Sequence, residues 1–557
     1  MNSYNHQKYT KIVAVDKPDR RWPSKTLVTA PAWCSVDLRD GNQALIDPMT
    51  PSQKLEMFEM LVGVGFKQIE VGFPAASQTD FDFVRQLVDE NRVPEDVTIQ
   101  VLTQARKELI ERSFESLKGA RKAIMHVYNS TSTVQREQVF KMSREQVKQI
   151  AIDGATWVKE CAAKQTDTQW QFQYSPESFT GTELDYAVEV CNAVIDVWQP
   201  NAEQKCILNL PATVEVATPN VYADQIEWFC DNIDQRQDVI VSLHTHNDRG
   251  CAVAASELGV LAGADRVEGT LLGNGERTGN MDIVTMGMNL YSAGVQPNLD
   301  FSHMDRIINV VERCTALKVH PRHPYAGELV FAAFSGSHQD AINKCLALHE
   351  PDTHWEVAYL PVDPRDLGRT YQQVIRINSQ SGKGGVAYVL EQEYGIKIPR
   401  WLQVDFSPVV QQKAERTEAE VQVEEVADLF FETYLPAQPR MSLKSYQVSR
   451  SDQQDSLDAV MLIDGAEHII QGKGRGVLEA FSAGLKHNTG RDIVIIEYNE
   501  HTLGNNDGSH AMAYVQISVD SQRVCAAGKS RDILGATLSA ILNAVSRSDK
   551  VLEQKIV

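Results

Sequence analysis

The feature that most constrains the fold is a regular alternation of strand-like and helix-like segments across residues 25–294. Short runs rich in β-branched and aromatic residues are each followed by a longer stretch with helical periodicity. Eight strands alternating with helices predict a (β/α)8 TIM barrel, and an open doubly wound sheet is the alternative. The expected strands are residues 33–38, 68–73, 98–103, 122–128, 169–175, 206–210, 239–244 and 266–270. Helical patterns include residues 52–64, 78–89, 143–162, 224–233 and 252–262.

A barrel of this kind carries its catalytic groups at the C-terminal ends of its strands. Polar side chains do follow the expected strands: Arg39, Asp40, Thr103, His126, Tyr128, Glu177, Asn209, Thr213, His244 and His246. A glycine-rich loop, residues 273–280 (GNGERTGN), comes after the eighth strand. Such a loop can hold an anion against backbone N–H groups, and this one lacks the βαβ context of a dinucleotide fingerprint. We therefore expect the active site at this end of the barrel.

Two histidines, His244 and His246, close the seventh expected strand. Residues i and i+2 of an extended strand point to the same face, so both imidazoles are expected on one side. With a carboxylate from elsewhere in the chain, they can hold a divalent cation and leave coordination positions open for a substrate. A His-x-His pair also occurs by chance, and its place in the barrel favours the metal site.

The composition excludes several classes of protein. The 557 residues are 43% hydrophobic and 23% charged, which is typical of globular chains with several domains. A formal net charge of −20 argues against nucleic-acid binding, which requires a basic face. No apolar run reaches the length of a membrane span, and residues 1–23 lack the hydrophobic core of a signal peptide. Nine scattered cysteines without a Cys-x-x-Cys pair predict reduced thiols and a cytoplasmic protein.

Three motifs, in this order, resemble a known family: residues 38–43 (LRDGNQ), 244–248 (HTHND) and 273–280 (GNGERTGN). Together they are similar to the alpha-isopropylmalate/homocitrate synthase family in its longer form. The resemblance runs over nearly the whole chain and includes residues 334–340 (FSGSHQD). It implies an acyltransferase that joins the methyl carbon of acetyl-CoA to the ketone carbon of a 2-oxo acid and then hydrolyses the thioester. The expected 2-oxo acid is 3-methyl-2-oxobutanoate, at the first committed step of leucine biosynthesis.

The resemblance also implies a metal centre in the barrel. Asp40, His244 and His246 are the expected ligands, with Asn280 as a fourth ligand or as a partner of bound water. Mixed oxygen and nitrogen ligation suits Mg²⁺, Mn²⁺ or Zn²⁺, and the sequence leaves the choice open. Arg39 would stabilise the alkoxide that develops on the substrate, and a surface salt bridge is its alternative role.

The acetyl methyl group is a weak acid, so the reaction needs a general base. The resemblance implies that Glu177 and His338 form a carboxylate–histidine pair for this step, and Glu276 is a further carboxylate at the mouth. His338 lies beyond the barrel, and in the family its segment comes from the partner subunit of a dimer. We therefore expect a homodimer. A solvated His338 without a catalytic role is the alternative.

Four more residues are candidates for substrate binding. Thr213 is expected to hydrogen-bond the substrate carboxylate, and structural capping is its alternative role. His126, Ser175 and Asn209 are expected to line the pocket. His126 fits equally well as a satisfied core histidine.

Four regions are expected along the chain. They are an N-terminal extension (residues 1–25), the barrel (26–298), linker subdomains (299–437) and a C-terminal domain (438–557). In the linker, residues 304–317 and 411–433 have helical patterns. Residues 382–385 (GKGG) lack the spacing of a nucleotide phosphate loop and predict a turn that opens a helix over residues 386–393.

The C-terminal domain contains an internal repeat of about 55 residues. Each copy runs from a strand through a glycine-containing turn into a helix, over residues 459–464, 472–475 and 477–485, then 513–520, 528–531 and 533–545. By resemblance this domain binds leucine as an inhibitor, and the matching positions are Gly474, Gly476 and Leu478. Arg475 and Val477 depart from the usual Asn and Pro of that turn, which leaves the strength of inhibition open. A purely dimerising domain is the alternative.

Other functions remain possible at this stage. A sister synthase acting on pyruvate or 2-oxoglutarate would keep the mechanism and change only the 2-oxo acid. A non-catalytic leucine-binding protein would be expected to lack part of the metal set, and no member is missing. A lyase on the same barrel would not need the C-terminal repeat.

Overall fold

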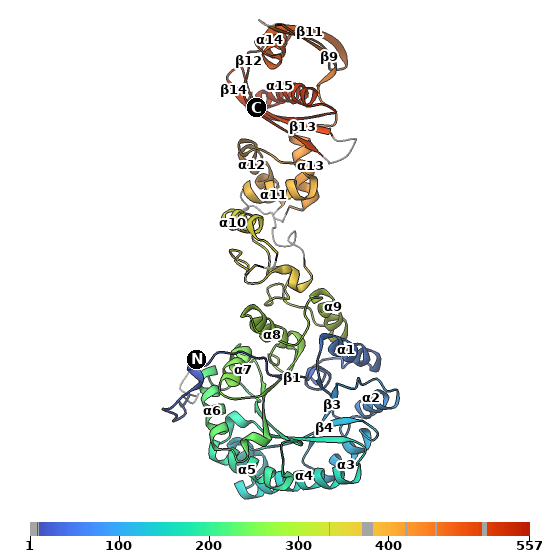
Figure 1. The fold of residues 1–557 in the computed structure, drawn as a ribbon, viewed down its shortest axis with the longest axis vertical. Helices are drawn as coiled ribbons and strands as arrows, with labels where there is room; N and C mark the ends of the chain where they lie inside the picture. The colour runs from blue at the N-terminus through green and yellow to red at the C-terminus, as the bar shows by residue number, and fades with distance from the viewer. Residues whose placement is uncertain are drawn as a thin grey trace, which may run out of the picture. The chain divides into compact units, whose positions relative to one another are not determined.

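The computed structural model describes residues 8, 11–333, 335–351, 353–369, 383–417, 421–451, 454–503 and 510–556. The chain divides into two compact units (Figure 1). The first comprises Met1–Val330 and Arg365–Gly368, and the second comprises Phe331–Pro364 and Arg369–Val557. Two residues of the sequence motifs, Phe334 and Gly382, lie outside the described residues.

The first unit is built on a closed barrel of parallel strands in the order β1 to β8, ringed by helices (Figure 1). The strands are β1 (Ala32–Ser35), β2 (Gln68–Gly72), β3 (Thr98–Gln104), β4 (Lys122–Ser130), β5 (Gln169–Glu177), β6 (Cys206–Ala212), β7 (Val239–Thr245) and β8 (Arg266–Gly269). The pairing of β1 with β8, which sets Cys34 opposite Glu268, closes the ring. The TIM-barrel prediction is therefore confirmed, and the open sheet is excluded.

The helices of this unit follow the strands as predicted. They are α1 (Pro51–Val64), α2 (Gln78–Asp89), α3 (Lys107–Ser116), α4 (Arg144–Lys164), α5 (Leu184–Trp198), α6 (Pro219–Asn232), α7 (Ala252–Leu261), α8 (Ile283–Ser292) and α9 (Met304–Thr315). Local sequence fixes their ends, as α1 shows. Thr50 and Gln53 form a capping box at its start, and Gly65, with φ 111°, ends it in the left-handed conformation.

Some strand ends differ from the prediction in a way that shapes the site. β1 stops at Ser35, because the chain turns at once into the π-helical segment η3 (Asp37–Gly41). The carboxylate of Asp37 accepts hydrogen bonds from the backbone N–H of Leu271, at 3.1 Å, which ties this turn to the loop after β8. β4 and β5 run longer than expected, and their last residues, Ser130 and Glu177, pair in register.

The N-terminal extension is tied to helix α6. Arg20 donates two hydrogen bonds of 2.7 Å to the buried carboxylate of Asp224, and the indole N–H of Trp22 donates to the same group at 2.9 Å. Lys17 reaches Asp231 at 2.8 Å. The polar N-terminal sequence thus forms a dense set of ion pairs on the outside of the barrel.

The second unit begins with helices. They are α10 (Gly336–Leu348), α11 (Lys383–Tyr394), α12 (Arg400–Thr417) and α13 (Val423–Tyr434). The prediction of one helix over residues 411–433 is wrong, because Gln422 and Glu425 form a capping box that starts a new helix, α13. Aromatic rings join the two helices, with centroids 5.5 Å apart for Phe406 and Phe430.

The C-terminal part of this unit contains two three-stranded antiparallel sheets, each followed by a helix (Figure 1). They are β9 (Met441–Arg450), β10 (Asp455–Ile463), β11 (Ala466–Gly474) and α14 (Val477–Thr489), then β12 (Ile493–Leu503), β13 (His510–Val519), β14 (Gln522–Ser530) and α15 (Ile533–Ile556). The predicted repeat is confirmed, and both copies contribute to one apolar core. Gly472 and Gly528 occupy equivalent places, where a Cβ would meet the carbonyl oxygen of Ala480 at 1.9 Å or of Ala536 at 2.1 Å.

Among the described residues, no helix combines the length and the apolar character needed to cross a bilayer. All nine cysteines are free thiols.

Candidate active site

The predicted metal ligands converge at the C-terminal mouth of the barrel. Ligand atoms of Asp40, His244 and His246 all lie within 4.8 Å of one another, and all three residues are buried. The Oδ2 atom of Asp40 is 3.2 Å from Nε2 of His244 and 3.6 Å from Nε2 of His246. The η3 turn delivers Asp40, while the alternation along β7 and its continuation brings both imidazoles to the same face.

Asn280, the predicted fourth ligand, lies next to His246. Met281 donates its backbone N–H to Thr245 at 2.8 Å, and Asn280 forms an isolated bridge with His246. The side-chain Nδ2 of Asn280 donates to Asn274, whereas its buried Oδ1 accepts no hydrogen bond from any described residue. A buried oxygen without a partner beside a carboxylate and two imidazoles fits a divalent cation with oxygen and nitrogen ligands.

The electrostatics of the cluster suit a cation. Burial opposes the ionisation of Asp40, but Arg39, His244 and His246 together outweigh it and hold the pKa of Asp40 well below its usual range. Burial, together with the neighbouring His244, lowers the pKa of His246 to about 4. Burial would lower the pKa of His244 as well, but hydrogen bonds to Asp40 and Glu268 raise it to about 9. A cation bound here would replace the proton that His244 otherwise holds between two carboxylates.

A buried polar floor lies beneath the cluster. Its members are Glu70, Gln100, His126, Gln173, Arg266 and Glu268. Arg266 donates to the Glu268 carboxylate at 2.8 Å and to the Gln100 side-chain oxygen at 2.9 Å. His126 Nδ1 lies 2.8 Å from Glu70, and its Nε2 lies 2.7 Å from the Ser175 hydroxyl. His126 is therefore a buried histidine with both ring nitrogens hydrogen-bonded, and it also lines the cavity, so both predicted environments are present.

Of these floor residues, only His126 was predicted from the sequence. The available signal was the presence of polar residues at alternate positions inside short apolar strands, such as Arg266 and Glu268 in β8. Alternation puts both side chains on the inner face of the barrel, where a charged group needs a partner.

Arg39 connects the floor to the cavity. Its Nη1 donates to Asp40 at 2.9 Å, and its Nε donates to the buried carboxylate of Glu70. The guanidinium is mostly buried, and the adjacent carboxylates raise its pKa despite that burial. The alternative of a surface salt bridge is therefore wrong for Arg39.

A cavity of about 170 Å³ opens above the cluster. Of the predicted residues, it is lined by Arg39, Asp40, His126, Tyr128, Ser175, Glu177, Asn209, Thr213, His244, His246 and Glu276. Gln43, Phe73, Leu102, Pro211 and Arg277 also line it and were not predicted. Chain segments far apart in the sequence thus meet around one small polar space with a few apolar walls, which is typical of a small-molecule site.

The polar groups on the wall have partners that orient them. Thr213 accepts a hydrogen bond of 2.9 Å from the backbone N–H of Ser178, so it does help to cap a turn. Glu177 accepts from the Ser130 hydroxyl. At the rim, Glu276 accepts from Gln43 at 2.7 Å.

His338 belongs to the second unit, on α10. Its ring stacks on Tyr359, with centroids 4.0 Å apart and an interplanar angle of 23°. The side chain is half-buried, so it is not freely solvated.

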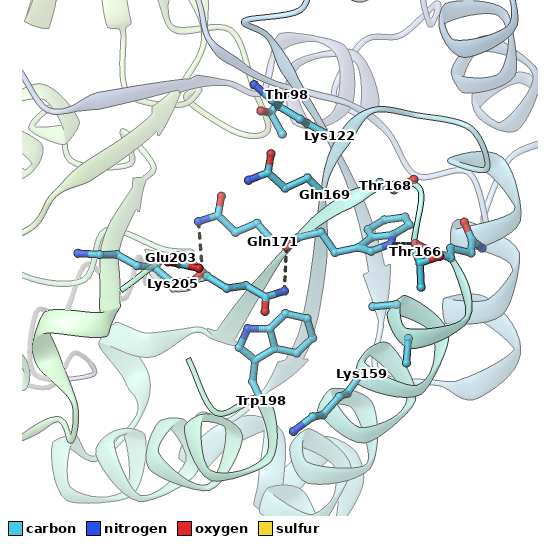
Figure 2. A pocket seen from close by; sticks show the side chains of 15 residues that line it. Thr98, Lys122, Lys159, Thr166, Thr168, Gln169, Gln171, Trp198, Glu203 and Lys205 are labelled. Carbon is cyan, nitrogen blue, oxygen red and sulfur yellow. Dashed lines mark hydrogen bonds between the residues drawn. The ribbon is translucent and has the colours of Figure 1, made fainter. Parts of the chain in front are cut away.

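A larger cavity, of about 790 Å³, lies among the strand starts of the same barrel (Figure 2). Thr98, Lys122 and Gln169, the first residues of β3, β4 and β5, line it. Lys159 on its wall donates to the backbone carbonyl of Val197 at 2.8 Å. No predicted site residue lines this cavity, and strand starts serve stability in barrels of this type. The smaller cavity at the strand ends is therefore the candidate active site.

Comparison with known proteins identifies the family of the chain. The family described as HMGL-like matches residues 30–311. The alpha-isopropylmalate synthase, post-catalytic domain-like family matches residues 328–391, and the LeuA allosteric (dimerisation) domain matches residues 420–548. A 2-isopropylmalate synthase of Alcanivorax borkumensis is 54% identical over 556 residues, which cover 100% of this chain and 99% of the relative. The chain belongs to the 2-isopropylmalate synthase family.

Further relatives extend the comparison. A 2-isopropylmalate synthase of Pseudomonas syringae pv. syringae is 53% identical over 543 residues, which cover 97% of each chain. A solved hydroxymethylglutaryl-CoA lyase from Pseudomonas aeruginosa is 18% identical, with a TM-score of 0.42. The match covers 52% of this chain and 93% of the lyase. That likeness is too distant to support an argument. Enzymes of the 2-isopropylmalate synthase family are acyltransferases, and the chain is an enzyme of this class.

The predicted regulatory positions lie where β11 turns into α14. Gly474 ends β11, and a Cβ there would lie 2.5 Å from the backbone nitrogen of Ala480. Gly476 precedes the helix with φ −156°, and Leu478 packs partly against the shared core. The Glu479 carboxylate accepts from the backbone N–H of Arg475 at 2.8 Å.

Proposed function

We propose that the chain condenses acetyl-CoA with 3-methyl-2-oxobutanoate and hydrolyses the thioester to release 2-isopropylmalate and CoA. One observation carries the proposal: Asp40, His244 and His246 meet at a small cavity in a chain 54% identical, along its full length, to an enzyme of that name. The reaction would be the first committed step of leucine biosynthesis, in the cytoplasm.

Asp40, His244 and His246 would hold a divalent cation, Mg²⁺, Mn²⁺ or Zn²⁺, with Asn280 as a fourth ligand or as a partner of bound water. The buried Oδ1 of Asn280, which accepts no hydrogen bond from the described residues, supports that donor set. When bound, the cation supplies Lewis-acid polarisation of the ketone of the 2-oxo acid.

A carboxylate–histidine pair is assigned to the first proton transfer. Glu177 orients the imidazole of His338, and together they remove a proton from the acetyl methyl group, after which the methyl carbon bonds to the ketone carbon. The ketone oxygen gains the electron pair of its C=O π bond, and the fixed guanidinium of Arg39 stabilises the negative charge until the oxygen is protonated. Water then attacks the thioester carbon, the C–S bond breaks, and the sulfur leaves as the thiol of CoA.

The remaining lining residues bind and orient the substrates. Thr213 hydrogen-bonds the carboxylate of the 2-oxo acid, and His126, Ser175 and Asn209 line the pocket. Glu276 is a second carboxylate at the mouth, available to the water of the hydrolytic step. The lining of Phe73, Leu102 and Pro211 supports a 2-oxo acid with an apolar side chain.

Leucine inhibition and dimerisation are assigned to the C-terminal repeat. The match of residues 420–548 to a domain described as allosteric and dimerising supports a homodimer with an effector site. Gly474, Gly476 and Leu478 are the proposed regulatory positions.

The deciding experiment measures thiol release from acetyl-CoA with Mg²⁺ or Mn²⁺ across 3-methyl-2-oxobutanoate, pyruvate and 2-oxoglutarate, each with and without leucine. We expect the fastest release with 3-methyl-2-oxobutanoate, and its suppression by leucine. Faster release with pyruvate or 2-oxoglutarate would assign the chain to a sister reaction, a citramalate or homocitrate synthase. No release with any of the three acids would refute the proposed condensation.

A further inference from the structure

We infer that Glu268 is a positioning residue that fixes the imidazole of His244 in the orientation and tautomer needed to bind a cation. The inference rests on the proposed metal site and goes beyond it, because Glu268 touches neither the cavity nor the proposed cation. Glu268 is a buried carboxylate in β8, and hydrogen-bond donors from neighbouring strands hold it.

The carboxylate of Glu268 is fully buried and hydrogen-bonded at both oxygens. Its Oε1 accepts from Arg266 and from Gln173, both at 2.8 Å. Its Oε2 lies 2.8 Å from Nδ1 of His244 and accepts from Asn209 at 3.2 Å. These partners come from four strands, β5, β6, β7 and β8, and together they hold the carboxylate in place.

This contact decides which nitrogen of His244 carries the proton. A neutral imidazole has one N–H and one lone pair, and a carboxylate at Nδ1 requires the N–H there. The lone pair then lies on Nε2, the atom that faces Asp40 at 3.2 Å. His246 has no such support, because its buried Nδ1 has no hydrogen-bond partner among the described residues. Glu268 therefore supports the proposed site through the imidazole of His244 and not through that of His246.

A second role for Glu268, as a direct metal ligand, is disfavoured by the donors around it. Ligand atoms of Glu70, His126 and Glu268 do lie within 4.8 Å of one another. However, the Nε2 group of Gln100 lies between them and donates to Glu70 at 2.5 Å and to Glu268 at 3.2 Å. Arg266 adds a positive charge against the same carboxylate. A cation would have to displace these donors, so the group is a scaffold for the site above it.

The test compares Mn²⁺ binding by the full chain after removal of metal with a chelator, using the electron paramagnetic resonance signal of free Mn²⁺. In Glu268→Gln, the amide can present N–H to Nδ1 and so favour the wrong tautomer of His244. We expect the dissociation constant for Mn²⁺ to rise about 10- to 100-fold, as is typical when a carboxylate partner of a ligating histidine is lost. Circular dichroism and thermal unfolding of the metal-free protein establish that the variant is folded.

The matched control is Ser242→Ala. The Ser242 hydroxyl accepts from Arg266 at 2.7 Å, so its loss loosens the same floor while leaving the contact between Glu268 and His244 in place. We expect its Mn²⁺ affinity to stay within about threefold of the wild type. If Glu268→Gln does not fold, Glu268→Asp serves instead, since it keeps the charge but withdraws it from Nδ1.

Each result has one meaning. A folded Glu268 variant with wild-type Mn²⁺ affinity would overturn the inference, and so would an equal loss of affinity in Ser242→Ala. A wild-type chain that binds no Mn²⁺ would instead refute the proposed metal site. Normal Mn²⁺ binding without thiol release would refute the proposed reaction and leave the role of Glu268 standing.

Discussion

Asp40 and His244 lie side by side, with Oδ2 of one 3.2 Å from Nε2 of the other, although 204 positions separate them in the sequence. Closure of the barrel between β1 and β8 produces this contact, because it brings the turn after β1 next to the end of β7. The candidate metal site is therefore a consequence of the closed sheet, because the strand order of the barrel makes Asp40 and His244 neighbours.

The guanidinium of Arg39 bridges two carboxylates, and this bridging predicts that lysine cannot replace it. The single ammonium group of lysine cannot keep the contacts with both Asp40 and Glu70 and still face the cavity. We expect Arg39→Lys to lower kcat about 10²- to 10³-fold, with a smaller effect on KM for the 2-oxo acid. Steady-state kinetics at saturating metal measure both values, and a kcat within a factor of a few of the wild type would contradict the role of Arg39 at the alkoxide.

Glu177 is expected to act before the new carbon–carbon bond forms. We expect Glu177→Gln to lower turnover about 10²- to 10⁴-fold, the usual contribution of a general base. It should also abolish exchange of the acetyl methyl protons with deuterated water. Ser130→Ala is the control, because it removes only the hydroxyl that donates to Glu177. Undiminished methyl exchange in Glu177→Gln would assign the base to another group.

The sequence predicted the residues at the strand ends, and the residues that it did not predict were missed for one physical reason. Strand positions followed from the alternation of segments, and strand ends then located Asp40, His244 and Glu177 along the chain. The floor residues Glu268 and Gln100 were missed, because their partners come from other strands and only closure of the sheet makes them neighbours. No periodicity in one segment contains that information.

The role of His338 can be tested by mixing defective chains. If His338 acts in the site of the partner subunit, a dimer of one Glu177→Ala chain and one His338→Ala chain has one intact site. Random co-assembly of the two inactive chains should then restore about a quarter of wild-type turnover. Coexpression with two affinity tags, followed by purification of the mixed dimer, isolates the species with one intact site, which should show about half of wild-type turnover. A mixed dimer as inactive as its parents would mean that both residues serve the same chain.

Low pH should reduce the free energy of unfolding of the barrel by protonating Glu183, the residue just before α5. A hydrogen bond from Arg136 is the main cause that lowers the pKa of Glu183 to about 2, from 4.5. A lowered pKa stabilises the folded state above pH 4.5, and this contribution is lost as the pH falls from 4.5 towards 2. Because the side chain is 34% exposed, we expect only about 1 kcal/mol at neutral pH after solvent screening.

Urea unfolding of the wild type and Glu183→Gln at pH 7 and pH 3.5 measures this difference. The gap between the two chains should narrow at the lower pH. Asp196→Asn is the control, because Asp196 is an exposed carboxylate on α5 that forms no ion pair with a described residue. A gap for Glu183→Gln that is constant with pH would show that the ion pair with Arg136 contributes nothing to acid sensitivity.

Two glycines in the turn between β11 and α14 allow stability and leucine inhibition to be tested by separate substitutions. A Cβ at Gly474 would lie 2.5 Å from the nitrogen of Ala480, so Gly474→Ala must push β11 away from α14, at a cost of about 1–3 kcal/mol. At Gly476, φ is −156° and no described atom lies within 4 Å of an added Cβ, so Gly476→Ala fits the fold. If leucine binds against this turn, Gly476→Ala should raise the leucine concentration for half-inhibition about tenfold, a loss of about 1.4 kcal/mol in binding free energy, without lowering Tm.

Thiol release measured against leucine concentration, paired with thermal unfolding, measures both effects. Unchanged inhibition in Gly476→Ala, beside a lowered Tm in Gly474→Ala, would move the leucine site away from the turn while leaving the packing argument intact.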